Sequence, residues 1–228
     1  MHADYYLNFL YPLQDRVLKS IEKANQAFYL TGGTAISRVY LHHRFSDDLD
    51  LFVNRSPNFQ NEALKIFDQL TLDFEKVEKS LFDTEFVRLF VIENNVKLKV
   101  ELINDIGYHY NGLIESSIFD KTDNWQNILS NKITALGRQE GKDCADIVMI
   151  SLNYPFVWSE IMEQASMKDA WINALLAAEM LSTMPLEKIQ LVNWITQPNY
   201  DDLLEKLQII SRDILLGHAN SLYKPNDQ

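Results

Sequence analysis

Residues 32–52 read GGTAISRVYLHHRFSDDLDLF, and this segment carries most of the information about the fold. A short apolar run at 27–30 leads into the double glycine, which is typical of a strand that ends in a tight turn. The next residues, about 34–42, have helical apolar spacing, and 48–53 alternates as a second strand does. The segment therefore predicts a strand, a glycine turn, a helix and a second strand of an α/β fold.

Composition limits the class of protein. The chain has 228 residues, 46% of them hydrophobic and 23% charged, which is ordinary for a globular protein. Its single cysteine excludes an intrachain disulfide, and its net charge of −11 argues against a broad basic surface for nucleic acid. We find no signal peptide and no long uncharged apolar run, so we expect no membrane contact and a cytoplasmic location.

The predicted secondary structure changes along the chain from strands and helices to helices alone. Residues 85–92 and 96–103 are rich in β-formers and flank a turn at 93–95, which predicts a hairpin. Beyond about residue 120 only helical periodicity remains. The predicted helices are 125–138, 142–152, 158–167, 169–180, 186–195 and 200–218. We predict an α/β class with a mixed sheet flanked by helices over residues 1–110, followed by an all-helical C-terminal domain over 111–228.

The glycine turn favours a phosphate. Gly32 and Gly33 allow a ligand to approach the backbone closely, and the N–H groups at a helix start attract anions. Thr34 adds a hydroxyl donor. We therefore predict that Gly32, Gly33 and Thr34 hold the phosphates of a nucleotide.

Two acidic side chains follow at strand spacing. Asp48 and Asp50 project from one face of the predicted strand and repel each other unless a cation lies between them. Mg²⁺ prefers such hard oxygen ligands and also accepts phosphate oxygens. On the hairpin, alternation places Lys97, Lys99 and Glu101 on one face, and Glu101 is our candidate for a third metal ligand. The pattern is typical of two-metal phosphoryl or nucleotidyl transfer.

The segment 32–52 resembles the AbiEii nucleotidyltransferase family, the toxins of bacterial toxin–antitoxin systems within the DNA polymerase β-like superfamily. The resemblance covers about residues 27–150. It includes a helical lysine with a nearby arginine, here Lys132 and Arg138, and a Lys-Asp-x-x-Asp motif at 142–146. One departure is that the aromatic residue usual inside that motif is absent.

The resemblance implies roles for individual residues. Asp48 and Asp50 match the metal-binding pair, Lys132 the essential lysine and Asp143 the essential later aspartate. Asp146 matches a second acid that holds a helix or an arginine in place. The implied reaction transfers a nucleotide from an NTP, with Mg²⁺ or Mn²⁺, to a tRNA or protein acceptor, and the implied partner is a cognate antitoxin.

Two alternative functions stay open. One is a non-catalytic interaction protein that keeps the nucleotidyltransferase fold and binds a partner through its helical half. The other is a small-molecule nucleotidyltransferase of the aminoglycoside type, since the helical half offers many carboxylates to a cationic drug. These carboxylates are Glu160, Glu163, Asp169, Glu179 and Glu187.

Several other side chains have structural interpretations. We expect Arg44 to follow a helix C-terminus and to pair with Asp47 or Asp48. Cys144 is predicted to be a small buried hydrophobe. We assign Trp158, Trp171 and Trp194 to a helical core.

Overall fold

A computed structural model describes residues 2–24 and 27–225, which form two compact units. The first unit comprises the described residues of Met1–Val39 together with Phe45–Asn124. The second comprises Tyr40–Arg44 and residues 125–225. The chain therefore contributes one short segment, between the glycine helix and the first acidic strand, to the helical unit.

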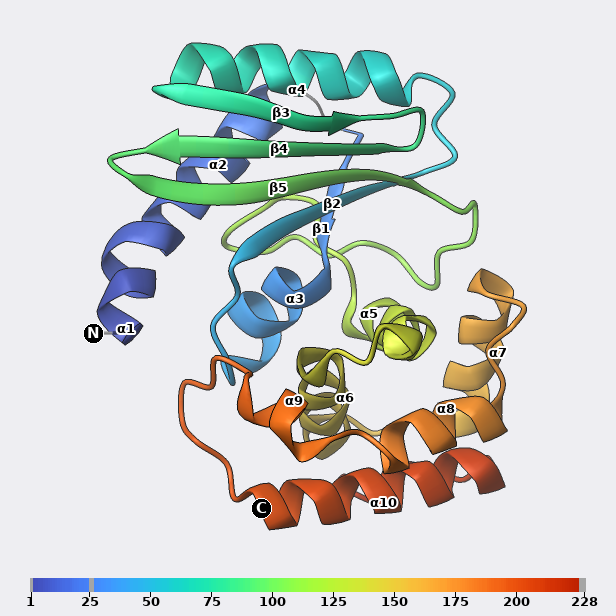
Figure 1. Ribbon diagram of the computed structural model, residues 1–228. Coiled ribbons are helices and arrows are strands. Elements are labelled where there is room, and N and C mark those ends of the chain that lie inside the picture. The colour runs from blue at the N-terminus through green and yellow to red at the C-terminus, as the bar shows by residue number, and fades with distance from the viewer. Residues whose placement is uncertain (1, 25–26, 226–228) are drawn as a thin grey trace. The chain divides into compact units, whose positions relative to one another are not determined.

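The first unit is built on a five-stranded mixed sheet (Figure 1). Its strands are β1 (Tyr29–Thr31), β2 (Asp48–Asn54), β3 (Lys76–Phe82), β4 (Phe86–Glu93) and β5 (Val96–Asp105). The order is β1-β2-β5-β4-β3, in which β2 and β5 run parallel and the other neighbours antiparallel. The parallel pair matters most, since it brings the acidic strand beside the second strand of the predicted hairpin.

Helices cover one face of this sheet. Helix α2 (Tyr11–Ala24) contacts β5, and α4 (Phe59–Asp73) contacts β3 and β4. The side chains of β2 and β5 alternate between buried and partly exposed, and Leu49, Leu51 and Val100 are fully buried. Since successive strand residues point to opposite faces, Asp48 and Asp50 project from the other face.

The N-terminal helix and the glycine helix complete this unit. Segments α1 (His2–Tyr5), η1 (Tyr6–Leu10) and α2 follow one another without a break, and Pro12 lies in the first turn of α2. The π-helical η1 precedes this proline, which lacks the N–H that a regular helix would use there. After β1, the chain forms α3 (Gly32–Ala35) and η2 (Ile36–Leu41).

The second unit is helical. Its elements are α5 (Trp125–Thr134), η3 (Ala135–Arg138), α6 (Gly141–Asn153), α7 (Trp158–Lys168), α8 (Ala174–Ser182), α9 (Leu186–Gln190) and α10 (Tyr200–Leu216). Helix α6 contacts α5, α9 and α10 (Figure 1). Its residues Cys144, Ala145 and Ile147 are fully buried. The segment Tyr40–Arg44 joins this unit, where the N–H of Ile195 donates to the carbonyl of His43 (3.1 Å).

The predicted fold class, a mixed sheet flanked by helices and followed by an all-helical part, is confirmed. The strands at 27–30 and 48–53 and the hairpin lie within a residue or two of their predicted positions. The helix predicted at 169–180 is wrong at its start, because Asn173 caps α8 by accepting from the N–H of Leu176. The helix predicted at 186–195 ends at Gln190.

No helix in 2–24 or 27–225 has the length and hydropathy that crossing a bilayer requires.

Candidate active site

The glycine turn of the first unit lies directly against an acidic side chain. Gly32 has φ +67°, in the left-handed region, where a side chain would be strained. A Cβ on Gly32 would lie 2.5 Å from Oδ2 of Asp50. Strand pairing explains this closeness, because Thr31 is the partner of Asp50 in the β1–β2 register. Glycine is thus required here both by backbone conformation and by space.

Thr34 fixes the glycine helix to the acidic strand. Its side chain is buried; the hydroxyl donates to the backbone carbonyl of Asp48 and lies 2.9 Å from Oγ of Ser46. The Thr34 proton is therefore used inside the unit. The assignment of Thr34 to phosphate binding stays a prediction, and the contacts give the residue a structural role as well.

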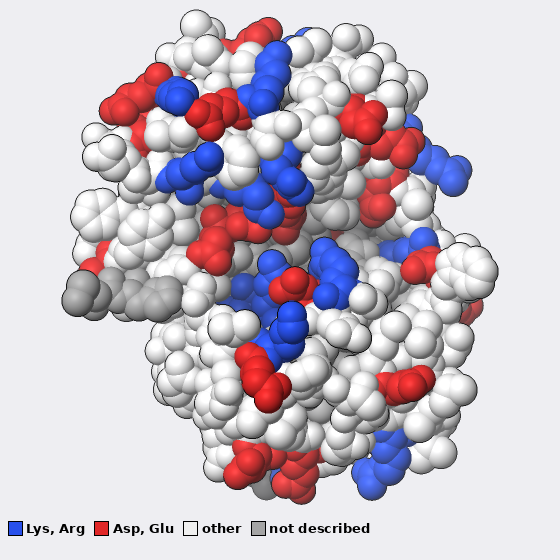
Figure 2. Space-filling view, in the orientation of Figure 1, with Lys and Arg blue, Asp and Glu red and all other residues white. Residues whose placement is uncertain are grey.

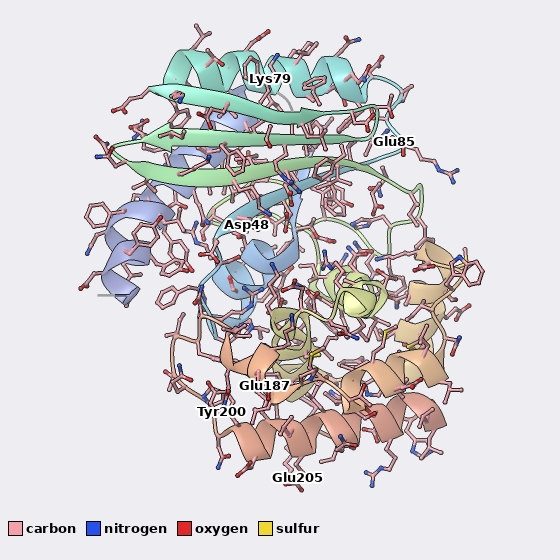
Figure 3. All side chains as sticks on the ribbon, in the orientation of Figure 1. Asp48, Lys79, Glu85, Glu187, Tyr200 and Glu205 are labelled. Carbon is pink, nitrogen blue, oxygen red and sulfur yellow. The ribbon has the colours of Figure 1, made fainter. Side chains whose placement is uncertain are left out.

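The two predicted metal-binding acids share the sheet face that α2 and α4 leave uncovered. Asp48, labelled in Figure 3, begins β2, and its side chain is 25% exposed. Asp50 is also partly exposed, whereas Leu49 and Leu51 between and beyond them are fully buried. The predicted alternation of acidic and apolar side chains is confirmed.

Strand β5 places a lysine and a glutamate beside these acids. In the parallel register Asp48 pairs with Lys99, and Asp50 pairs with Glu101. The Lys99 ammonium lies 2.8 Å from Oδ2 of Asp48 and 3.2 Å from Oε2 of Glu101. Partial burial disfavours charged Lys99, but these two carboxylates outweigh it and raise the pKa of the lysine.

Glu101 also has a partner on β4. Nε of Arg88 donates to Oε1 of Glu101 (2.7 Å). Burial of Glu101 opposes ionisation, but the hydrogen bond from Arg88 and the charge of Lys99 prevail and lower the pKa of the carboxyl. Figure 2 shows Lys and Arg side chains interleaved with Asp and Glu side chains over these strands.

The ion pairs of Lys99 and Arg88 with the acidic side chains affect how these acids could bind a metal ion. Among the described residues no group of three or more His, Cys, Asp or Glu side chains is arranged to hold a metal ion. Glu101 does lie beside Asp50 in register, as the face pattern predicts, but two cations hold its carboxylate. Its role as a third metal ligand stays a prediction.

In the second unit, the predicted lysine lies in a buried cluster of charges. The ammonium of Lys132 is 2.7 Å from Oδ1 of Asp143 and 2.7 Å from Oδ2 of Asp146. Burial would lower the pKa of Lys132, but Asp146 and Asp143 raise it above its ordinary value. From the exposed side, Arg138 Nη2 donates to Oδ2 of Asp143 (3.0 Å). The structure thus places Lys132 and Asp143 in direct contact.

Asp146 is the anchor of this cluster. Arg44 donates to it twice, from Nε to Oδ1 (2.7 Å) and from Nη2 to Oδ2 (2.8 Å), and His43 Nε2 lies 2.9 Å from Oδ1. Burial penalises the carboxylate, yet Arg44 and Lys132 hold its pKa well below the ordinary value. Asp146 therefore holds an arginine in place, as we predict. Asp146 is thus a partner of Arg44 that the sequence did not predict; Asp48 pairs with Lys99, and a pairing of Arg44 with Asp47 stays a prediction.

Other structural expectations have mixed outcomes. Cys144 is fully buried, and Trp158 and Trp194 are core residues, as predicted. Trp171 is 86% exposed, so its assignment to the core is wrong. It lies in the turn between α7 and α8, where its backbone N–H donates to the side chain of Asp169. Outside a helix, the helical spacing of apolar residues does not predict which side chains are buried.

Sequence reasoning missed the contacts of Lys99 with Asp48 and Glu101. The alternation along 96–102 places Lys99 on the same face as Glu101, and this was the feature of the sequence from which their contact could have been predicted. The partner on β2 depends on a parallel register between segments about fifty residues apart.

The fold is similar to that of two solved structures. The structure is similar to the crystal structure of JHP933 from Helicobacter pylori, with a TM-score of 0.61 and 16% identity over 89% of this chain and 90% of that one. A second H. pylori structure, of a candidate nucleotidyltransferase, matches with a TM-score of 0.61 and 16% identity over 89% and 93% of the two chains. At this identity the likeness shows the fold, which is that of the nucleotidyltransferase class.

The family follows from the sequence. The model of the family described as "Nucleotidyl transferase AbiEii toxin, Type IV TA system" matches residues 16–208, and the chain belongs to that family. It is accordingly an enzyme of the nucleotidyltransferase type. No curated protein matches the chain.

Proposed function

We propose that the protein is a Mg²⁺- or Mn²⁺-dependent nucleotidyltransferase that moves a nucleotide from an NTP to an acceptor and releases pyrophosphate, as the toxin of a toxin–antitoxin pair. The observation that carries the proposal is how near the Asp50 carboxylate lies to Gly32, where an added Cβ would come within 2.5 Å of Oδ2. It sets a glycine turn suited to phosphates beside an acid suited to a divalent ion.

The carboxylates fit a hard divalent cation. Asp48 and Asp50 offer oxygen ligands from one partly exposed face, and among the described residues Oδ1 of Asp48 takes part in no hydrogen bond or ion pair. When bound, Mg²⁺ would neutralise the triphosphate and polarise the bond that breaks. Asp48 and Asp50 would hold the ion, whereas the carboxylate of Glu101 contacts Arg88 and Lys99.

The glycine turn would hold the triphosphate through its backbone. Gly32 leaves room for the Asp50 carboxylate beside the turn, and the chain enters a helix there, whose first N–H groups would attract an anion. Thr34 supports this turn from inside through its bonds to Ser46 and Asp48. Gly33 supplies the second flexible backbone position.

In the second unit, Lys132 and Asp143 are our proposed catalytic residues. The lysine stays charged because two buried carboxylates hold it, and a fixed cation is the kind of group that offsets charge on a transferring phosphate. Asp143 would position the ammonium, since it contacts Lys132 directly. The assignment to catalysis rests on the family resemblance.

For the acceptor we propose a tRNA or a protein, and for the partner a cognate antitoxin, in the cytoplasm. The family description supports the toxin role and hence an antitoxin. The net charge of −11 disfavours strong non-specific RNA binding, so an RNA acceptor would have to be recognised by local contacts.

The test is a labelling assay. The purified protein is incubated with each α-labelled NTP, Mg²⁺ or Mn²⁺, and either total tRNA or total protein. We expect label transfer from at least one NTP. Asp48→Asn should lower the rate about a hundredfold or more, the size of effect seen when one preorganised charge-stabilising group is lost.

The matched control is Glu78→Gln. Glu78 lies on β3 of the same sheet and pairs with Lys76 and Lys97 at the surface. Its variant should retain the wild-type rate. Absence of label with every NTP and acceptor fraction, or equal rates for Asp48→Asn and wild type, would refute the proposed function.

A further inference from the structure

The ammonium of Lys99 occupies a position between two of the three acidic side chains of the sheet. It contacts Oδ2 of Asp48 at 2.8 Å and Oε2 of Glu101 at 3.2 Å. Both contacts follow from strand register, because Lys99 lies opposite Asp48 and two residues before Glu101 on the same face of β5. The arrangement is therefore built into the sheet.

A cation is needed at this point. The carboxylates of Asp48 and Glu101 project from adjacent parallel strands on one face and would repel each other without a positive charge between them. In a site that uses two divalent ions, a bridging ion supplies that charge. Here the lysine side chain already supplies it.

The far side of Glu101 is neutralised as well. Arg88 reaches Oε1 of Glu101 from β4 through Nε and Nη2, both at 2.7 Å. Charges thus alternate across the strands: Asp48 on β2, Lys99 and Glu101 on β5, and Arg88 on β4. A divalent ion shared by Asp48 and Glu101 would have to displace Lys99 and would meet Arg88 nearby.

We propose that Lys99 replaces a second divalent ion, so that the site binds one divalent ion per chain, held by Asp48 and Asp50. The inference rests on the proposed function, whose metal site it specifies. It assigns to Glu101 the task of holding Lys99, with Arg88 as its second partner. Lys99 is accordingly a positioning residue that sets the number of ions.

The test counts bound Mn²⁺. Protein saturated with a non-hydrolysable NTP analogue is dialysed against Mn²⁺, and bound metal is measured by electron paramagnetic resonance. We expect one ion per chain for the wild type and a second ion for Lys99→Met, which keeps the side-chain length and removes the charge. Lys99→Arg should stay at one.

Lys97→Met is the matched control. Lys97 lies on the same face of β5, two residues from Lys99, and pairs with Glu78. Its loss should leave the count at one. Circular dichroism of each variant confirms that it is folded, and the wild-type count decides the matter should Lys99→Met not fold.

The outcomes separate two failures. A wild-type protein that binds two ions, or a folded Lys99→Met variant that still binds one, overturns the role of Lys99 and leaves the nucleotidyltransferase proposal standing. A wild type that binds neither the analogue nor Mn²⁺ overturns the proposed function and this inference with it.

Discussion

Replacing Asp146 by Asn should strongly destabilise the helical unit. The Asp146 side chain is fully buried and holds three groups, with contacts of 2.7 and 2.8 Å to Arg44, 2.7 Å to Lys132 and 2.9 Å to His43. Asparagine keeps the size of the side chain but removes the charge, and its amide N–H₂ then faces other donors. The variant therefore deprives Arg44 of this carboxylate and leaves Lys132 with Asp143 as the remaining acid of the pair.

The magnitude follows from the burial of this network. Removing one partner of a buried ion pair costs about 3–5 kcal/mol of unfolding free energy. For a chain of this length, 1 kcal/mol corresponds to roughly 2–4 °C in Tm, so Asp146→Asn should melt about 6–20 °C below the wild type. Tryptophan fluorescence follows the transition, because all four tryptophans, Trp125, Trp158, Trp171 and Trp194, belong to the helical unit.

Lowering the pH should reduce the difference in Tm between the wild type and Asp146→Asn. The folded-state pKa of Asp146 is lowered, whereas the unfolded chain has an ordinary value of about 3.9. The carboxylate therefore stabilises the fold fully above about pH 4, and its contribution is lost as pH falls toward the folded pKa. Melting curves at pH 7 and near pH 3 measure this change.

Asp202→Asn is the control for the same unit. Asp202 is exposed on α10 and pairs with Lys206 one turn along the helix, an arrangement worth about 0.3–0.5 kcal/mol. Its Tm should stay within about 2 °C of the wild type. Equal melting temperatures for the Asp146 and Asp202 variants would refute the reasoning.

Two further substitutions and one chemical modification test the close packing inside each unit. Gly32→Ala should lose about 1–2 kcal/mol of stability from its left-handed φ, and should lose transferase activity because the new Cβ displaces the carboxylate of Asp50. Gly141→Ala should cost at least about 1–3 kcal/mol, because its Cβ would lie 2.1 Å from the backbone oxygen of Lys188. Cys144 should not react with a thiol reagent at pH 8 before unfolding, since burial and the neighbouring Asp143 raise its pKa to about 12.

The two glycine substitutions have matched controls. A Cβ on Gly112 meets no atom within 4 Å, and one on Gly137 meets only the end of Met180 at 4.0 Å, so Ala at either position should leave the melting curve nearly unchanged. If Gly112→Ala or Gly137→Ala lowered the Tm as much as Gly32→Ala and Gly141→Ala do, the steric argument would be contradicted.

For Cys144, modification of the native protein at the rate of an exposed thiol would contradict the predicted protection of this thiol.

The core of the first unit could be predicted because its signals are local. The alternation of Asp48 and Asp50 with Leu49 and Leu51 fixes which side of β2 is buried, and the sheet follows it. The asparagines at 94–95 adopt positive φ in the hairpin turn, which is the backbone conformation that tight hairpins require.

Helix ends in the second unit were harder to predict. Trp171 continues an apolar pattern that suggests a helix from 169, yet the chain turns at Asp169 and restarts at Ala174 under the cap of Asn173. Capping residues compete with periodicity, and a single sequence does not tell which of two nearby polar side chains takes the cap.

The charged clusters show a different limit. Asp143 and Asp146 lie three residues apart on α6, so a helix brings both to one side, and Lys132 from α5 meets the two together. The two carboxylates differ in the other side chains that they contact. Asp146 contacts the buried side chains of Arg44 and His43, whereas Asp143 contacts Arg138, whose side chain is 62% exposed.

Parallel strand pairing hides the remaining part of the site from the sequence. The register that joins Asp48 to Lys99 pairs two segments separated in sequence by α4, β3 and β4, because a parallel pair needs a crossover connection. A shift by one residue would turn Lys99 and Glu101 together to the other face, away from Asp48. The pairing of the acids is a property of one strand, but the cation between Asp48 and Glu101 is a property of the folded sheet, and the number of metal ions that the enzyme binds would then be set by that sheet.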